Sequence, residues 1–205
     1  MKRFLSLLLL LSALTYGKNG CVLEQSGKMD VIWQAYKTPD KIGVKGTFDS
    51  ISYTPAHRTG KNFKELFVGS TILIDASTPN TKNSLRDEKL VTFFFKQLKE
   101  TTIKGKILAI KADPYTKGKP RTGKLTVELS MNGHSRKVLL DYHYFKESFK
   151  AQGNIDLVDF AAGKALATIN KACFDLHKGK TWSDVSIGFI TTVKATLCHV
   201  DLKKR

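Results

Sequence analysis

The sequence GKLTVELSMNGHSRKVLLDYHYF, residues 123–145, carries the clearest fold signal in the chain. Its first half alternates apolar and polar residues, which is the two-residue period of a strand with one buried and one wetted face. Asn132-Gly133 follows, a dipeptide that tolerates positive φ and closes tight hairpins. The second half alternates again. We therefore predict an antiparallel hairpin that turns one apolar face inward, formed by Leu125, Val127, Leu129, Met131, Val138, Leu140, Tyr142 and Tyr144.

The same alternation recurs on both sides of this hairpin. Residues 18–28 are expected to be an irregular lead-in and residues 54–64 a polar loop, followed by apolar residues that cover an open end (Phe63, Leu66, Phe67). A change of parity near Asp49-Ser50 predicts a bulge. The chain thus has about eight strands, the others being expected at residues 29–36, 44–53, 71–76, 103–109, 149–155 and 185–197.

Two segments have helical rather than strand periodicity. The first is short, begins at Ser84 as N-cap with Asp87 in its first turn, and places Leu90, Phe93 and Phe94 on one face. Those aromatic residues form either a core plug or a lid that contacts a ligand. The second helix, residues 160–177, is expected to end at Gly179 and to pack on the barrel or over one of its ends with Ala162, Leu166, Ile169, Cys173 and Leu176.

The polar faces of the strands decide between a soluble and a membrane barrel. A membrane barrel is apolar outside, and a lysine facing lipid at mid-depth costs about 2–4 kcal/mol. The face opposite the apolar one here carries Lys104, Lys106, Lys124, Glu128, Lys137, Asp141 and Lys194. The apolar faces are therefore expected to point inward, in a soluble barrel whose interior is either filled by its own side chains or open to one small ligand.

The N-terminus is typical of an export signal. Lys2 and Arg3 precede an apolar run that is too short to span a membrane comfortably, and small residues follow as far as Gly17. We predict a cleavable signal peptide at residues 1–17, a single domain at 18–205, and a periplasmic or secreted protein. A retained anchor and a lipoprotein attached at Cys21 are the alternatives, the second disfavoured by Lys18-Asn19-Gly20.

Three cysteines leave one thiol over if two of them pair in an oxidising compartment. Either Cys198 or Cys173 is a candidate partner for Cys21, and the sequence does not decide between them. There is no Cys-x-x-Cys motif, so neither a thioredoxin site nor a zinc knuckle is predicted.

The order of these motifs resembles the YceI family. Residues 72–95 resemble its strand, turn and Arg-Asp-x-x-Leu…Phe-Phe segment, and residues 123–140 resemble its central hairpin. Val44-Lys45-Gly46-Thr47-Phe48 and the segment from Gly153 to Phe160 are also similar to family motifs. The resemblance implies a mainly β protein, an eight-stranded antiparallel lipocalin-like barrel with a short helix after strand 3 and a longer helix before the last strand. It also implies that a polyisoprenoid or another long-chain amphiphile binds inside.

The ligand-binding residues expected from this resemblance line the barrel or its helical lid. They are Trp33, Phe48, Ile72, Ile74, Leu90, Phe93, Phe94, Leu125, Val127, Leu140, Tyr142 and Phe189. Arg86 and Asp87 either contact a headgroup or form a structural salt bridge. Two departures from the family concern the barrel ends: Tyr36-Lys37-Thr38 stands where the family usually has a His-Ser pair, and the second helix is longer than usual.

Two other classes of function fit the sequence less well than lipid binding does. The five histidines lack metal-ligand spacing and no nucleophile elbow or phosphate loop occurs, so we expect no catalytic residue, no metal ligand and no cofactor besides the lipid. The net charge of +16 fits a module that binds polyanions or a membrane surface without a lipid cavity, with residues 104–124 as its docking patch. Nucleic acid is disfavoured because Tyr115 is the only aromatic residue in that patch. The identity of the lipid, its carriage, storage or sensing, and homodimerisation stay open.

Overall fold

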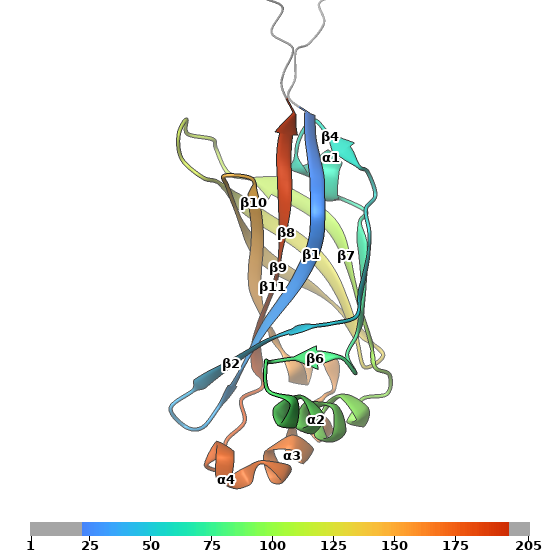
Figure 1. Ribbon diagram of the computed structural model, residues 1–205, viewed down its shortest axis with the longest axis vertical. Helices are drawn as coiled ribbons and strands as arrows, with labels where there is room; N and C mark the ends of the chain where they lie inside the picture. The colour runs from blue at the N-terminus through green and yellow to red at the C-terminus, as the bar shows by residue number, and fades with distance from the viewer. Residues whose placement is uncertain (1–21, 197–205) are drawn as a thin grey trace, which may run out of the picture.

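The computed structural model describes residues 22–196, and these form one curled antiparallel sheet with helices gathered mainly at one end (Figure 1). The strands are β1 (Val22–Lys37), β2 (Ile42–Phe48), β3 (Ile51–Thr54), β4 (Thr59–Gly60), β5 (Thr71–Asp75), β6 (Pro79–Asn80), β7 (Thr102–Ala112), β8 (Arg121–Met131), β9 (His134–Phe145), β10 (Ser148–Asp156) and β11 (Asp184–Thr196). The helices are α1 (Phe63–Phe67), α2 (Ser84–Phe93), α3 (Gly163–Ala172) and α4 (Phe174–His177), with short 3-10 turns η1 (Phe95–Gln97) and η2 (Leu157–Phe160).

The strand order is β3-β5-β7-β8-β9-β10-β11-β1-β2-β6, with β4 added beside β1. β2, near one margin of the sheet, continues almost directly into β3 at the other margin, since only Asp49 and Ser50 separate the two strands. β2 pairs with β1 while β3 pairs with β5, so one bent segment serves both margins of the sheet. The antiparallel barrel-like fold predicted from the sequence is confirmed, and so is the break near Asp49-Ser50.

The central hairpin is built as its sequence predicts. β8 pairs with β9 in register from Arg121↔Tyr144 to Met131↔His134, and Asn132 and Gly133 turn the chain with φ of 54° and 75°. Leu125, Leu140 and Tyr142 are buried, whereas Lys137 and Asp141 on the opposite face are exposed. The apolar faces of the sheet point inward.

Several details differ from the sequence-based expectation. The part of the chain that the structure describes has eleven strands rather than eight, because β2 and β3 count separately and β4 and β6 are two-residue pairings. β1 begins at Val22, within the expected lead-in, since its first residues pair with the end of β11. Ala109, which its alternation with Ile103 and Ile107 predicts to face inward, is exposed, because the register with β8 shifts between Ile107 and Ala109.

The helical segments also differ from the sequence-based expectation. Asn83 rather than Ser84 caps α2, its side chain accepting from the backbone N–H of Arg86. The expected 160–177 helix is divided into η2, α3 and α4, because the backbone leaves helical dihedrals at Cys173 (φ −120°, ψ 24°). Leu176 is consequently exposed instead of buried. The chain turns after α4 at Lys178 and Gly179, which both have positive φ.

Some predictions fall on residues 1–21 and 197–205, which lie outside the described part of the chain. These are the signal peptide, the pairing of Cys21 with Cys198 or Cys173, and Leu197 at the end of the last strand. Cys173 itself is buried and forms no disulfide among the described residues.

Candidate functional site

The end of the sheet that carries α1 is filled by the protein's own aromatic side chains. Phe149 is fully buried and stacks on Tyr142 and Phe189, at centroid separations of 5.1 and 6.0 Å. Phe63 and Phe67 of α1 reach down onto the same ring, at 5.1 and 4.7 Å. The expectation that α1 covers an open end is confirmed, since all three of its apolar residues are buried (Phe63, Leu66, Phe67).

The opposite end, which α2 and α3 cover, contains a cavity of about 470 Å³. This lies within the range of about 300–1,000 Å³ that is usual for small-molecule sites. The walls come from the inner faces of β1, β2, β5, β7, β8, β10 and β11, and the floor from the helices, which lie across the end of the sheet in Figure 1. Apolar side chains dominate the lining, among them Val31, Trp33, Ala35, Val44, Phe48, Ile74, Leu90, Phe94, Ile103, Leu129, Ile155, Leu166, Ile169, Val185 and Ile187.

Trp33 forms part of the wall because its neighbour on β2, Gly46, has no side chain. Its ring lies across Gly46 on β2, where any Cβ would come within 2.2 Å of the indole. The indole N–H donates to the Thr47 carbonyl at 3.2 Å, and the ring packs at 6.2 Å from Phe48. Gly46 is therefore needed for the position of the tryptophan.

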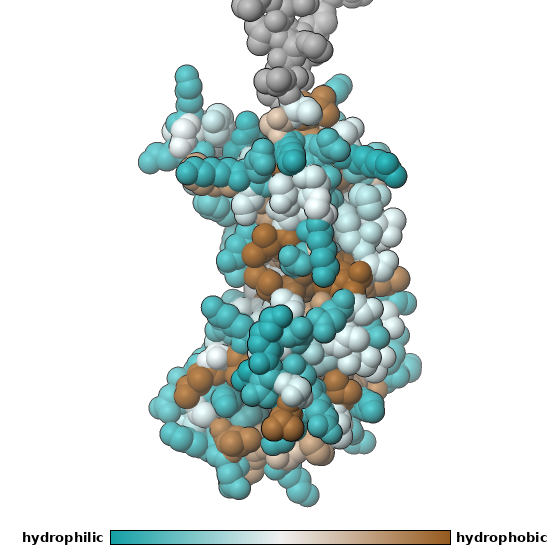
Figure 2. Space-filling model, viewed as in Figure 1, coloured by the Kyte–Doolittle hydropathy of each residue, from teal (hydrophilic) through white to brown (hydrophobic). Residues whose placement is uncertain are grey.

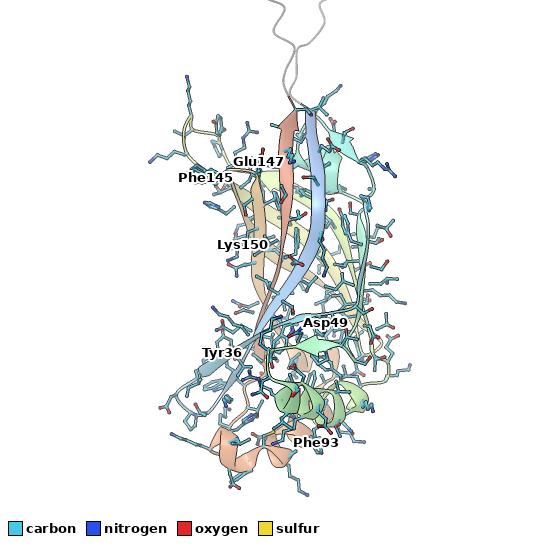
Figure 3. All side chains as sticks on the ribbon, viewed as in Figure 1. Tyr36, Asp49, Phe93, Phe145, Glu147 and Lys150 are labelled. Carbon is cyan, nitrogen blue, oxygen red and sulfur yellow. The ribbon has the colours of Figure 1, made fainter. Side chains whose placement is uncertain are left out.

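The structure divides the twelve sequence-predicted ligand-binding residues between the two ends. The cavity lining includes Trp33, Phe48, Ile74, Leu90 and Phe94. Elsewhere in the packed interior lie Ile72, Leu125, Val127, Leu140, Tyr142 and Phe189. Phe93, also outside the lining, packs at the edge of the core, and Figure 3 places it below α2 at the level of α3.

Sequence reasoning missed the polar side of the cavity. Its lining also contains Tyr36, Lys37, Asn83, Arg86, Lys89, His177, Thr181 and Trp182. Three signals in the sequence pointed there: the Tyr36-Lys37-Thr38 departure, the unusual length of the second helix and the arginine of the Arg-Asp pair. The contribution of α3 followed from its helical period, which brings Leu166, Ile169 and Cys173 to the floor.

Arg86 and Asp87 do not pair with each other in the described structure; both hold Thr81. The Arg86 guanidinium donates to the Thr81 hydroxyl at 2.8 Å and to its carbonyl at 3.1 Å. The Asp87 carboxylate accepts from the Thr81 hydroxyl at 2.6 Å and its backbone N–H at 2.9 Å. The predicted direct salt bridge is thus replaced by a shared threonine, which fixes α2 to the loop before it.

A chain of hydrogen bonds orients His177 at the end of α4. Asn170 donates to the Gly179 carbonyl at 3.2 Å, and its own carbonyl accepts from the Thr181 hydroxyl at 2.8 Å. Since the Thr181 proton is used in this way, its oxygen accepts from Nδ1–H of His177 at 2.7 Å. The neutral imidazole then keeps its unprotonated Nε2 for another partner. Burial, together with the nearby charges of Lys37 and Lys89, lowers the pKa of His177 below its usual value.

Within residues 22–196, no three histidine, cysteine or acidic side chains lie close enough together to hold a metal ion. Among the same residues, no helix is both long and apolar enough to cross a membrane. What the cavity offers chemically is an apolar space with a basic and aromatic margin.

Comparison with known proteins agrees with this fold. The YceI-like domain matches residues 31–193. Among solved structures, a polyisoprenoid binding domain from Saccharophagus degradans implicated in plant cell wall breakdown is 12% identical with a TM-score of 0.56, covering 86% of this chain and 99% of that one. BcnA from Burkholderia cenocepacia is 14% identical (TM-score 0.53; 81% and 96% covered). The YceI protein of Campylobacter jejuni is 22% identical (0.51; 75% and 85%). Curated protein sequences include no significant match.

Proposed function

The chain belongs to the YceI-like family, and from this premise we propose that it binds the hydrocarbon chain of an amphiphilic lipid in the cavity that α2 and α3 cover. The observation that carries the proposal is the cavity itself, about 470 Å³ of largely apolar space inside the sheet. Each methylene moved from water into such a space contributes about 0.8 kcal/mol. A hydrocarbon tail can therefore bind tightly with few polar contacts.

The solved relative that binds polyisoprenoids supports a lipid of isoprenoid or similar type. A water-sized group occupies about 30 Å³ in a liquid, so the cavity accommodates on the order of fifteen such groups. We therefore expect a tail of moderate length. A much longer chain would need either the packed end to open or part of the tail to remain outside.

Native mass spectrometry of the purified protein tests the proposal, with an added mass that disappears on organic extraction as the expected result. Ala35→Phe places a ring in the cavity from β1, and should remove the bound lipid. Leu139→Phe adds similar bulk on the outer face of β9, where Leu139 is 62% exposed, and should leave the lipid in place. A wild-type protein that carries no lipid and binds none of those supplied would overturn the proposal.

The remaining elements of this function concern where the protein works. Residues 1–17 have the composition of a signal peptide, and we propose that they direct export to the periplasm or beyond. N-terminal sequencing of the protein from its native host should give a mature chain that starts near residue 18. An intact first residue would contradict export by cleavage.

An anionic membrane surface is the proposed place of loading or unloading. Lys104 and Lys106 are exposed on the outer face of β7, whereas Lys124 is already paired with Asp141 at 2.6 Å. Association with liposomes that contain phosphatidylglycerol should fall steeply with salt and weaken in a Lys104→Gln/Lys106→Gln variant. The paired Lys124 should matter less. Association that is indifferent to salt would exclude this role for the lysines.

A further inference from the structure

The mouth of the cavity can be located from two leucines. Leu85 of α2 and Leu176 of α4 both line the cavity and yet remain 71% and 61% exposed. Figure 2 shows apolar and hydrophilic residues interspersed over the helical end of the molecule. The cavity therefore reaches solvent at the helical end, beside α2 and α4.

All the ionisable side chains that can carry a charge near neutral pH in the cavity lining are basic. Its lining contains Lys37, Arg86 and Lys89 together with His177, and no aspartate or glutamate among the described residues. The acids on the neighbouring elements are engaged or turned away. Asp87 holds Thr81, while Asp40 and Asp184 pair with Lys178 and Lys41, and Glu88 and Asp175 are exposed outside the lining.

The backbone fixes one side of this mouth. Lys37 ends β1 and pairs in an isolated bridge with Thr181, the residue that orients His177. The flanking residues secure this bridge, since Thr38 N–H donates to the Lys180 carbonyl at 2.9 Å and Trp182 N–H donates to the Tyr36 carbonyl at 3.1 Å. Figure 3 shows Tyr36 at the end of β1 nearest the helices. Lys37 and His177 are thus held beside each other although 140 positions separate them in the chain.

The other side of the mouth is α2. Arg86 and Lys89 are three residues apart and so lie on the same helical face. Arg86 is committed through two of its nitrogens to Thr81, but the described structure gives the Lys89 ammonium no ion-pair partner. Lys37, Lys89 and His177 all line the same cavity, and both lysines contribute to the lowered pKa of the His177 imidazole.

We propose that the ligand is a single-tailed amphiphile with an anionic headgroup, carboxylate or phosphate, whose tail fills the cavity and whose headgroup lies at the mouth between Lys37 and Lys89, beside His177. This inference rests on the proposed function, because the mouth matters only if the cavity holds a tail. Two ammonium groups with no acid in the lining leave a net positive potential at the apolar opening, and an anion neutralises it. A neutral headgroup would leave both lysines without a partner.

Matched probes separate this proposal from lipid binding in general. Hexadecanoate and hexadecanol share a tail and differ in the charge of the headgroup. Isothermal titration at pH 7.5 should show hexadecanoate binding at least tenfold more tightly than the alcohol. If neither hexadecanoate nor hexadecyl phosphate bound more tightly than the alcohol, the headgroup proposal would be overturned while lipid binding stands. Failure of both to bind would overturn the proposed function, and this proposal with it.

Charge-matched variants place the headgroup. Lys37→Gln/Lys89→Gln should weaken hexadecanoate binding about tenfold and leave hexadecanol unchanged. Lys137→Gln/Lys194→Gln removes the same charge from the outer faces of β9 and β11 and should change neither affinity. A similar loss in both double variants would show that only the overall charge matters, and would overturn the assignment to the mouth.

The two headgroup chemistries are distinguished by hexadecyl phosphate, with inorganic phosphate alone as the control. Tighter binding of either amphiphile than of hexadecanol supports the proposal, and the tighter of the two identifies the headgroup. Competition by inorganic phosphate at millimolar concentration would instead indicate an ion site independent of the tail, and would contradict it.

The pKa of His177 reports whether a negative charge is bound at the mouth of the cavity. The imidazole faces Lys37 of β1 and Lys89 of α2, with Asp175 on its own helix and Lys178 and Lys180 in the following turn. An anion at the mouth should raise the pKa of His177 in a ¹H–¹⁵N NMR titration, because it offsets the two lysines. An unchanged pKa with hexadecanoate bound would place the headgroup elsewhere.

Discussion

The two ends of one curled sheet differ in what occupies the space they enclose. At the α1 end, Phe63, Phe67 and Phe149 meet ring to ring, and Phe67 and Phe149 have no exposed surface. At the α2–α3 end, strands of the same alternating pattern enclose a cavity. The difference comes from the lids. The short helix α1 inserts two phenylalanines into the interior, whereas α2 and α3 lie across the opening.

The clearest way to break this comparison is to truncate one apolar side chain at each end. Phe149→Ala should lower the free energy of unfolding by about 3–5 kcal/mol, because the rings around it leave a buried void when it is lost. Leu90→Ala, in the half-buried face of α2 that already borders a cavity, should cost clearly less. Urea denaturation with unchanged m-values measures both. Equal losses would mean that the two ends are packed alike.

The reverse substitution adds a ring to each end. Ala151 of β10 has no exposed surface and pairs with Tyr142 and Phe189, so Ala151→Phe should cost about 1–3 kcal/mol through overpacking. Ala35→Phe enters existing space and should leave stability unchanged or increase it. If Ala35→Phe proved as damaging as Ala151→Phe, the cavity would not be available in solution.

Sequence periodicity could predict the strands but not this division of the interior. The hairpin at Asn132-Gly133 is local, and so are the alternations that bury Leu125 and Ile74. Nothing in those alternations distinguishes Leu125, at the packed end, from Ile74, which lines the cavity. The distinction depends on which lid reaches each residue, and that is decided by contacts between distant segments.

The mouth of the cavity illustrates the same limit. Lys37, Lys89 and His177 come from three elements and are brought together only when Lys37 pairs with Thr181 and α2 packs on α3. No spacing in the sequence relates them. The departure at Tyr36-Lys37-Thr38 indicated that the headgroup region differs from the usual family pattern, but not which residues replace it.

The dependence of affinity on tail length tests where the cavity ends and the packed end of the interior begins. Within a series of saturated carboxylates from decanoate to eicosanoate, each added methylene should improve the dissociation constant about fourfold while the tail still has room. The gain should fade near sixteen carbons, where the cavity is full and the aromatic rings block the way. The corresponding alcohols control for the headgroup. A gain that continues to eicosanoate would show that the packed end gives way.

The smallest expected effect is on the pH dependence of stability. The end with the cavity should lose stability below neutral pH, and the packed end should lose it above neutral pH. At the α2–α3 end, the pKa of His177 is lowered by burial and by Lys37 and Lys89. The unfolded chain therefore binds a proton more readily than the native one. The stability from this residue is present above pH 6.5 and is lost as pH falls toward the native pKa. At the packed end, burial raises the pKa of Tyr142 and Tyr144. Their contribution is present below pH 10 and is lost above it.

His177→Asn separates these two contributions, because the asparagine amide can still donate to Thr181 but does not titrate. Between pH 7.5 and 5.5, the variant should lose less stability than the wild type, whereas above pH 10 the two should decline together. His143→Gln, on the exposed face of β9, is the matched control and should behave as the wild type throughout. If the stability of His177→Asn and that of the wild type fell in parallel between pH 7.5 and 5.5, then protonation of His177 would not destabilise the native state. The positive field at the cavity mouth would then be too weak to attract an anionic headgroup, and the chemical contrast between the two ends would reduce to one of packing alone.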